Sequence, residues 1–245
     1  MTSPSPIAVV VGAGGGVGGA LMGRLLDAGR YTAVVGVARR RPDDWPDRPD
    51  AVFVQADVTQ EAEVAGLAEA VGDVGRPTRV IVATGLLHAE GVTPEKSMRA
   101  IDPEAMQRLF AVNAIAPALI AKHLLPLAPR DAPSLFAALS ARVGSISDNR
   151  LGGWYGYRAS KAALNQLIRT LAIEQRRTHP QAICVALHPG TVQTRLSAPF
   201  GQGAVATARR LTPDHSAKAL LDVMDGLTPA DTGGFFAWDG QPIGW

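Results

Sequence analysis

Cysteine is almost absent from this sequence of 245 residues, which contains only Cys184. A single cysteine excludes a disulfide framework and a zinc site built on several thiolates. It lies within the apolar run 182–187, so we interpret it as a buried packing residue. A hydrophobic core must therefore hold the fold together, and an apolar fraction of 47% is ample for one.

Lysine and long apolar runs are also scarce. The chain has 20 arginines but only 4 lysines, and its net charge of +2 comes with no basic stripe that would predict nucleic-acid binding. No apolar run approaches the ~20 residues needed to span a bilayer, and residues 1–6 lack the cationic patch of a signal peptide. The histidines show no ligand spacing. We therefore expect a soluble cytoplasmic protein that binds no nucleic acid, membrane or metal.

Short apolar runs alternate with helical segments along the chain. The runs show no polar–apolar alternation, which indicates strands buried on both faces, as in parallel sheets. We predict about seven strands, at Ile7–Val11, Ala33–Ala38, Ala51–Gln55, Arg79–Ala83, Ser134–Ser140, Ala182–Leu187 and Phe235–Trp238. The expected fold class is α/β, with a single domain over residues 1–245 that holds a Rossmann-like, doubly wound parallel β-sheet flanked by helices.

Capping signals predict where several helices begin. Thr59 precedes an acidic helix, and Asp102 and Thr212 each precede a proline, which is favoured at the first helical position. Pro117 lies inside the helix that Asp102 begins and predicts a kink close to Asn113.

A cluster of glycines follows the first predicted strand directly. Residues Val11–Gly18 read VGAGGGVG, and glycines let the backbone turn sharply and approach a pyrophosphate closely. The helix that follows offers its N-terminal N–H groups and positive dipole end to the same anion. We predict a dinucleotide site here, and a merely flexible turn is the alternative. The expected contacts are Gly12, Gly14, Gly15, Gly16, Val17 and Gly18.

The residues after the second strand bear on the choice of nucleotide. An acidic residue there would bind the ribose hydroxyls of NAD, but the chain has Arg39, Arg40 and Arg41. A guanidinium pairs well with the 2′-phosphate of NADP. We therefore predict NADP(H), with NAD(H) as the weaker candidate, and Arg39 and Arg40 as contacts. Solvated surface arginines are the alternative interpretation.

Tyr157 and Lys161 stand four residues apart at the start of a helix expected over Ala159–Arg177. That spacing places both side chains on one helix face, one turn apart. An ammonium beside a phenol stabilises the phenolate and lowers the phenol pKa, so that it can exchange a proton near neutral pH. The pair predicts general acid–base chemistry next to the nucleotide.

Together these motifs resemble the short-chain dehydrogenase/reductase family over nearly the whole chain. Two stretches, SARVGSISDN from Ser140 and WYGYRASKAALN from Trp154, resemble in particular the C-factor and sniffer-type carbonyl reductase branch, as does the terminal FFAWDGQPIGW. The family motifs match at Gly12, Gly16, Gly18, Asp57, Val58, Asn113, Tyr157, Lys161, Pro189, Gly190, Val192 and Thr194.

The resemblance implies roles for these residues. Tyr157 would protonate the substrate carbonyl, Lys161 would hold the nicotinamide ribose, and Asn113 would support a water-linked proton relay. Asp57 and Val58 would contact the adenine. Further cofactor contacts would come from Ala83, Thr84, Gly85, Pro189, Gly190, Thr191, Val192 and Thr194, beside Tyr157 and Lys161 themselves.

Three departures from the family pattern leave questions open. The usual Asn-Asn-Ala-Gly after the fourth strand is replaced by residues 82–85, which read VATG. The functional serine is usually the second of a pair, but here Ser140 is followed by alanine, whereas counting back from Tyr157 leads next to Ser145. Either serine can be the one that binds the substrate oxygen. The segment 86–100 is not explained by the family pattern.

The predicted function is an NADP-dependent oxidoreductase that transfers a hydride between nicotinamide and a carbonyl or secondary alcohol. The alternative is a non-catalytic dinucleotide-binding protein that acts as a sensor or signal. Residues 1–6 are expected to form a flexible tail, and residues 195–211 a substrate lid. The resemblance also implies a homodimer or homotetramer. The expected pocket segments contain no charged clamp that identifies the substrate.

Overall fold

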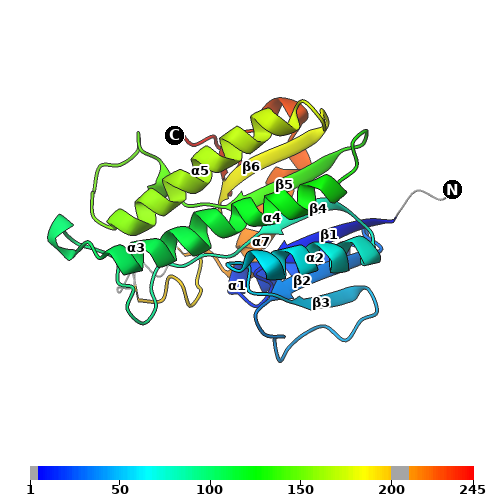
Figure 1. Cartoon of the computed structure of the whole chain (residues 1–245), viewed down its shortest axis with the longest axis horizontal. Coiled ribbons are helices and arrows are strands. Elements are labelled where there is room, and N and C mark those ends of the chain that lie inside the picture. The colour runs from blue at the N-terminus through cyan, green and yellow to red at the C-terminus, as the bar shows by residue number, and fades with distance from the viewer. Residues whose placement is uncertain (1–4, 200–209) are drawn as a thin grey trace.

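All seven strands join one parallel sheet in the order β3-β2-β1-β4-β5-β6-β7 (Figure 1). The computed structural model describes residues 5–199 and 210–245. The strands are β1 (Pro6–Val11), β2 (Ala33–Ala38), β3 (Ala51–Gln55), β4 (Arg76–Val82), β5 (Ser134–Leu139), β6 (Ala182–His188) and β7 (Phe235–Ala237). The predicted fold class and strand number are confirmed.

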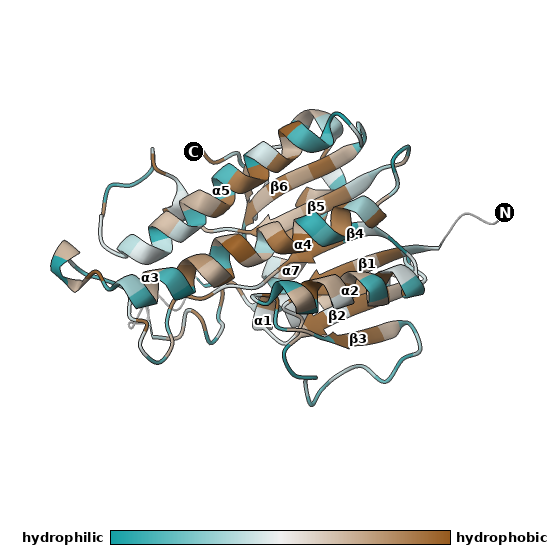
Figure 2. Cartoon of the chain, in the orientation of Figure 1, coloured by the Kyte–Doolittle hydropathy of each residue, from teal (hydrophilic) through white to brown (hydrophobic). Residues whose placement is uncertain are grey.

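Helices cover both faces of the sheet, and each face buries its own apolar core. In Figure 1 one set of helices lies in front of the sheet and the other behind it. The front layer contains α2 (Glu61–Val74), α4 (Ala116–Leu124) and α5 (Tyr155–Gln175), and the back layer contains α1 (Gly16–Ala28) and α7 (Pro213–Gly226). Figure 2 shows the result as hydrophobic strands between helices that carry hydrophilic stripes. Burial on both faces explains why the strand sequences lack alternation.

The strand order reverses at the middle of the sheet. From β1 the chain moves outward to β2 and β3, and it then returns to β4 on the other side of β1. The crossover connections therefore diverge above the carboxyl ends of β1 and β4 and leave a crevice between them. Ligands of doubly wound sheets bind in such a crevice.

One long helical stretch crosses the front face. α3 (Pro103–Phe110) continues through a π-helical turn at Ala111–Ile115 into α4, so the irregularity predicted near Asn113 takes the form of a π turn. The predicted cap at Asp102 is confirmed, because its Oδ1 accepts a hydrogen bond of 2.7 Å from the Ala105 N–H. Contrary to our reading of the apolar runs, residues Pro103–Leu127 are long and apolar enough to cross a membrane by length and composition; half of the most apolar window is buried inside the structure.

Two of the predicted helix starts were wrong. Thr59 does not cap α2, because its hydroxyl donates to Asp57 Oδ1 at 2.7 Å and α2 begins only at Glu61. α5 begins at Tyr155, four residues before the expected Ala159. The cap at Thr212 is confirmed, since its hydroxyl oxygen accepts a hydrogen bond of 3.1 Å from the N–H of His215.

β1 and α1 approach each other too closely for a side chain between them. A Cβ on Gly18 would lie 2.1 Å from the carbonyl oxygen of Gly12. Gly12 has a φ of +92°, and a Cβ there would lie 3.0 Å from backbone atoms of Ala83 and Thr84. The glycine turn therefore packs closely against α1 on one side and against the residues after β4 on the other.

Substitution of Gly18 by alanine should destabilise the protein. The added methyl group has no room beside the Gly12 carbonyl, so we expect Gly18→Ala to lower the free energy of unfolding by about 3 kcal/mol, as overpacking does. The matched control is Gly23→Ala in the same helix, where no atom lies within 4 Å of the Cβ position. That change should stabilise the protein by roughly 0.5–1 kcal/mol. Urea denaturation measures both, and equal effects of the two substitutions would contradict the packing argument.

Candidate active site

A cavity of about 1170 Å³ opens at the carboxyl ends of the central strands. Its wall combines the glycine turn after β1, the residues after β4, the end of β5, the first turn of α5 and the loop after β6. This is the crevice that the strand order creates. Its volume exceeds the roughly 300–1000 Å³ that holds one drug-sized ligand, which leaves room for a dinucleotide and a small substrate together.

The glycine turn forms one end of this cavity. Gly15 is the N-cap of α1 and makes no side-chain capping bond, and the first turn of α1 carries no acidic residue. The N–H groups of the first turn of α1 and its positive dipole end are thus available to an anion. The wall includes Gly14, Gly15, Gly16, Val17 and Gly18, whereas Gly12, the sixth predicted contact in this turn, does not line it. These residues fit the pyrophosphate of a dinucleotide.

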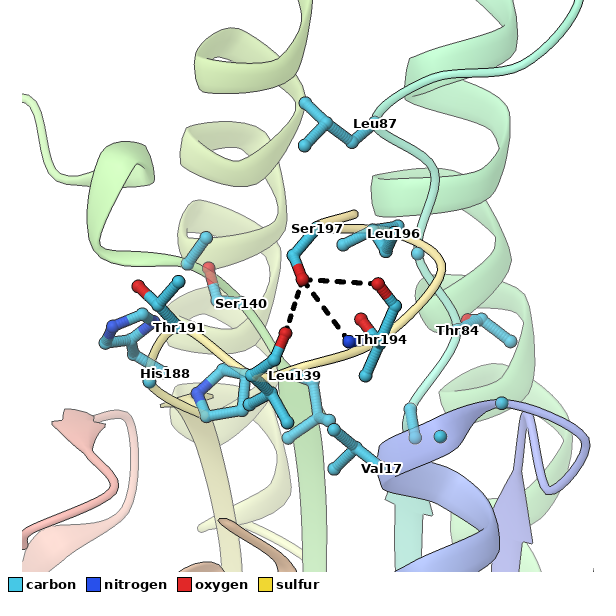
Figure 3. A pocket seen from close by; sticks show the side chains of 18 of the residues that line it. Val17, Thr84, Leu87, Leu139, Ser140, His188, Thr191, Thr194, Leu196 and Ser197 are labelled. Carbon is cyan, nitrogen blue, oxygen red and sulfur yellow. Dashed lines mark hydrogen bonds between the residues drawn. The ribbon is translucent and has the colours of Figure 1, made fainter. Parts of the chain in front are cut away.

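The loop after β6 lies directly over the start of α1. A Cβ on Gly16 would lie 2.8 Å from Thr194 Cγ2. The Ser197 hydroxyl donates to the carbonyl oxygen of Val192 and accepts a bond of 3.3 Å from the Thr194 N–H, which fixes the loop (Figure 3). The predicted lid over 195–211 lies partly outside the described residues, so only its ends are placed.

Gly190 brings the same loop against the end of the sheet. Its φ is +81°, and a Cβ there would lie 2.7 Å from Leu211 and 2.9 Å from Trp238. The Leu211 N–H donates to the Thr191 carbonyl at 2.9 Å. All of the predicted contacts from Pro189 to Thr194 line the cavity.

Two polar side-chain atoms in the cavity wall are buried without a protein partner. Thr84 Oγ1 and His188 Nδ1 form no hydrogen bond within the described part of the chain, and both residues line the cavity (Figure 3). Burial, reinforced by Arg142, lowers the pKa of His188 to about 4, so its imidazole is neutral near pH 7. Buried polar atoms are normally satisfied, so these two favour a polar ligand.

Tyr157 and Lys161 lie at the cavity wall in the first two turns of α5, as their spacing predicts. Tyr157 is only 6% exposed and packs in an apolar cluster with Leu87 and Leu109. Lys161 is 3% exposed, and its Nζ donates a hydrogen bond of 2.8 Å to the Leu139 carbonyl. The end of β5 therefore positions the ammonium.

The predicted lowering of the Tyr157 pKa does not occur in this structure. Burial raises the pKa of the Tyr157 phenol above its ordinary value of 10. Burial also lowers the pKa of Lys161 to about 7. The reason is that desolvation by burial disfavours the charged form of each group.

The structure separates the two candidate serines. Ser140 lines the cavity, and its Oγ donates to Asn165 Oδ1 at 2.6 Å. Ser145 lies away from the cavity wall, where its Oγ donates to the Gly244 carbonyl at 2.5 Å. Ala141, at the position of the family's usual serine, also lines the cavity. Geometry therefore favours Ser140 over Ser145 as a residue that can reach a ligand.

Asn113 is wholly buried in the π turn and is fully engaged. Its Oδ1 accepts from the Leu86 N–H, and its Nδ2 donates to the Leu86 carbonyl, both at 2.8 Å. The Nδ2 also donates to Ser160 Oγ at 3.0 Å, and that hydroxyl donates to the Tyr157 carbonyl at 2.9 Å. Asn113 thus ties the residues after β4 to α5, and its amide does not line the cavity.

Several predicted nucleotide contacts lie beyond the cavity wall. Arg39 and Arg40 are exposed just after β2. The Asp57 carboxylate accepts bonds from the Thr59 hydroxyl and N–H, which lower its pKa, and neither it nor Val58 lines the cavity. Ala83, Thr84 and Gly85 do line it, as predicted.

Several residues of the cavity wall were not predicted from the sequence. Asp44 lies at the wall near the glycine turn, although it follows β2 by six residues in an irregular loop. At the other end, which we call the substrate side, the wall includes Arg142, Arg150 and Arg158 beside Trp154, together with Asp148, whose carboxylate pairs with Arg142 at 3.5 Å. The charges of these residues can be read from the sequence, but only the folding of the loops brings the residues together at the cavity.

The remaining titratable groups of the described residues give no indication of a metal site or a reactive thiol. In residues 5–199 and 210–245, no group of three or more His, Cys, Asp or Glu side chains is arranged to hold a metal. Cys184 is buried in β6, and burial raises the pKa of its thiol to about 12, which agrees with a packing role.

The short-chain dehydrogenase family model matches residues 6–204, so this chain belongs to that family. The chain is 36% identical over 146 residues to the C-signal of Myxococcus xanthus, covering 59% of this chain and 81% of that protein. It is 30% identical over 190 residues to 1-hydroxy-2-glutathionyl-2-methyl-3-butene dehydrogenase of Rhodococcus sp. (strain AD45), covering 77% and 78% of the two chains. Its structure is similar to that of NADPH-bound carbonyl reductase from chicken fatty liver, with a TM-score of 0.83 and 26% identity over 100% of this chain and 96% of the other. The resemblance inferred from the motifs is confirmed, and the chain is an oxidoreductase of the short-chain dehydrogenase/reductase family.

The buried Lys161 should leave a signature in the pH dependence of stability. The unfolded chain holds this proton up to about pH 10.5, whereas the folded protein releases it above about pH 7, so the contribution of Lys161 to stability improves as pH rises between these values. We expect the stability advantage of Lys161→Met over wild type to shrink by roughly 3 kcal/mol between pH 7 and pH 10.

Urea denaturation at several pH values measures this difference. Lys218→Met is the matched control, because Lys218 is exposed and paired with Asp222. A difference between Lys161→Met and wild type that stays constant with pH would show that Lys161 keeps an ordinary pKa.

Proposed function

We propose that this protein is an NADP-dependent carbonyl reductase in which Tyr157 exchanges the proton with the substrate oxygen. The observation that carries the proposal is the placement of Tyr157 and Lys161, both buried, one helical turn apart and at the wall of a cavity whose other end is a glycine cradle. The similarity to a carbonyl reductase that binds NADPH supports both the reaction and the cofactor.

The bound nicotinamide supplies or accepts the hydride. In the direction of reduction, the raised pKa of Tyr157 keeps its phenol protonated and ready to donate to the carbonyl oxygen. The Lys161 ammonium, held by the Leu139 carbonyl, stabilises the phenolate that results. Ser140 can hydrogen-bond the same substrate oxygen once its hydroxyl turns from Asn165.

The substrate side of the cavity mixes apolar and cationic groups. Leu87 and Trp154 offer apolar surface, and Arg150 and Arg158 offer positive charge, whereas Arg142 is paired with Asp148. These residues favour a carbonyl substrate that combines an apolar body with a polar or acidic group.

Removing the Tyr157 hydroxyl should abolish most of the activity. Tyr157→Phe keeps the ring in its apolar cluster but removes the proton donor, so we expect kcat for carbonyl reduction to fall at least about 100-fold while NADPH binding stays unchanged. Tyr155→Phe, two residues earlier on the same helix, is the control, because Tyr155 is exposed. The assay follows NADPH oxidation with a panel of aldehydes, ketones and keto acids.

Near-normal turnover by Tyr157→Phe would refute the proposed chemistry. NADPH binding without turnover of any carbonyl by the wild type would instead favour the alternative of a non-catalytic nucleotide-binding protein.

Substitution of the basic residues Arg39 and Arg40, and separately of the acidic Asp44, tests which nucleotide the protein prefers. If Arg39 and Arg40 reach the 2′-phosphate, we expect the double alanine variant to bind NADPH about tenfold to 100-fold more weakly and NADH with unchanged affinity. Fluorescence titration with each nucleotide measures this, and Arg177→Ala, at an exposed site beyond α5, is the control. The competing outcome is that wild type prefers NADH and that Asp44→Asn removes the preference, which would assign the ribose to Asp44.

A further inference from the structure

The segment 86–100, which the family motifs leave unexplained, contains a buried carboxylate. Glu95 is only 4% exposed, whereas Glu90 in the same segment is exposed. A buried carboxylate is costly unless strong hydrogen-bond donors surround it. Its Oε2 has no hydrogen-bond partner within the described residues, so the bonds of Oε1 and of the backbone carbonyl indicate what Glu95 does.

The helix that carries Tyr157 begins in an unusual way. The three residues before it, Gly152, Gly153 and Trp154, all have positive φ, of 64°, 65° and 52°. Trp154 is the one residue other than glycine with positive φ among the described residues, and as the N-cap of α5 it provides no side-chain capping bond. Glycine adopts such a conformation readily, but for Trp154 it is sparsely populated and persists only where the surroundings hold it.

Glu95 provides what this helix start lacks. Its Oε1 accepts a hydrogen bond of 3.0 Å from the Gly156 N–H, the second residue of α5. Its backbone carbonyl accepts a bond of 2.5 Å from the Trp154 N–H. An N-cap side chain normally binds the N–H of the second or third helical residue, so Glu95 performs this function from a position 61 residues away.

The packing around Gly156 is specific for this arrangement. A Cβ on Gly156 would lie 2.9 Å from Glu95 Oε1 and 2.8 Å from Leu109 Cδ1. A glycine is therefore needed for the carboxylate to reach the helix. The Glu95 carboxyl group lies at the N-terminus of α5, the end where the helix dipole favours acidic side chains.

We propose that Glu95 is a positioning residue for catalysis, which caps α5 from the segment 86–100 and so holds Tyr157 in place at the cavity. Tyr157 directly follows Gly156, and its ring meets Trp154 edge-on with centroids 6.1 Å apart. Glu95 thus binds one residue that directly precedes Tyr157 in the chain and one whose ring contacts the Tyr157 ring. The catalytic part of this inference rests on the proposed role of Tyr157.

Three substitutions test the proposal. Glu95→Ala removes the cap, and we expect kcat to fall roughly tenfold to 100-fold while the Kd for NADPH stays within about twofold, because the glycine cradle is built from other elements. Glu95→Gln keeps an oxygen for the Gly156 N–H and should restore kcat to within about threefold of wild type. Glu90→Gln is the matched control and should leave kcat unchanged.

Amide hydrogen exchange of the first turn of α5, at residues 155–158, provides a readout that does not depend on turnover. We expect faster exchange in Glu95→Ala and near-normal exchange in Glu95→Gln. If the alanine variant does not fold, Glu95→Asp, which keeps the charge but is one methylene shorter, should lower kcat more than Glu95→Gln does.

Unchanged kcat and exchange in Glu95→Ala, a parallel loss of NADPH affinity and kcat, or a higher activity of Glu95→Asp than of Glu95→Gln would each overturn the proposal. Absence of carbonyl turnover in the wild type would remove the proposed function and with it the catalytic role of Glu95, whereas the exchange measurement would still decide whether Glu95 caps α5.

Discussion

The carbonyl oxygen of Gly12 occupies the place where a side chain on Gly18 would have to lie, and the rest of the cleft depends on this contact. It sets the distance between β1 and α1, and hence the direction in which the N-terminal N–H groups of α1 point. Gly12 also lies against the backbone after β4, and Gly16 lies against Thr194 from the loop after β6. Two segments distant in sequence are thus packed on one glycine turn. A larger residue in this turn would disturb the fold and the nucleotide end of the cavity together.

Burial sets the acid–base character of Tyr157 and Lys161. Tyr157 and Lys161 are both almost wholly buried, and desolvation pushes their pKa values towards the neutral form of each group. With its pKa raised, the Tyr157 phenol keeps its proton until an oxygen that can accept the proton comes close. An ammonium with a pKa of about 7 lies near the point where it can gain or lose a proton. The sequence spacing shows that the two groups are neighbours, but only the packing around Leu87, Leu109 and Leu139 shows how costly their charges are.

The strands could be predicted almost completely from the sequence, because a buried parallel strand is a short apolar run and little else. Helix starts were predictable where the cap is local, as at Asp102 and Thr212. The start of α5 was not, since its cap, Glu95, lies 61 residues earlier in the chain. The candidate site followed the same rule. Motif residues such as Tyr157 were found from their spacing, whereas Asp44 and the arginines on the substrate side reach the cavity through irregular loops that have no periodicity to interpret.

The segment 86–100 connects the parts of the substrate side to one another. The backbone of Leu86 is bound by the Asn113 amide on the long central helix. His88 Nε2 lies 3.0 Å from the carbonyl oxygen of Arg195 in the loop after β6. Glu95 binds the start of α5. The asparagine side chains that usually follow β4 in this family are missing here. The segment is held by these bonds and by one from Arg108 Nη1 to the Glu90 carbonyl at 2.6 Å. A ligand that moved this segment would therefore act on the start of α5 through Glu95 and on the loop after β6 through His88.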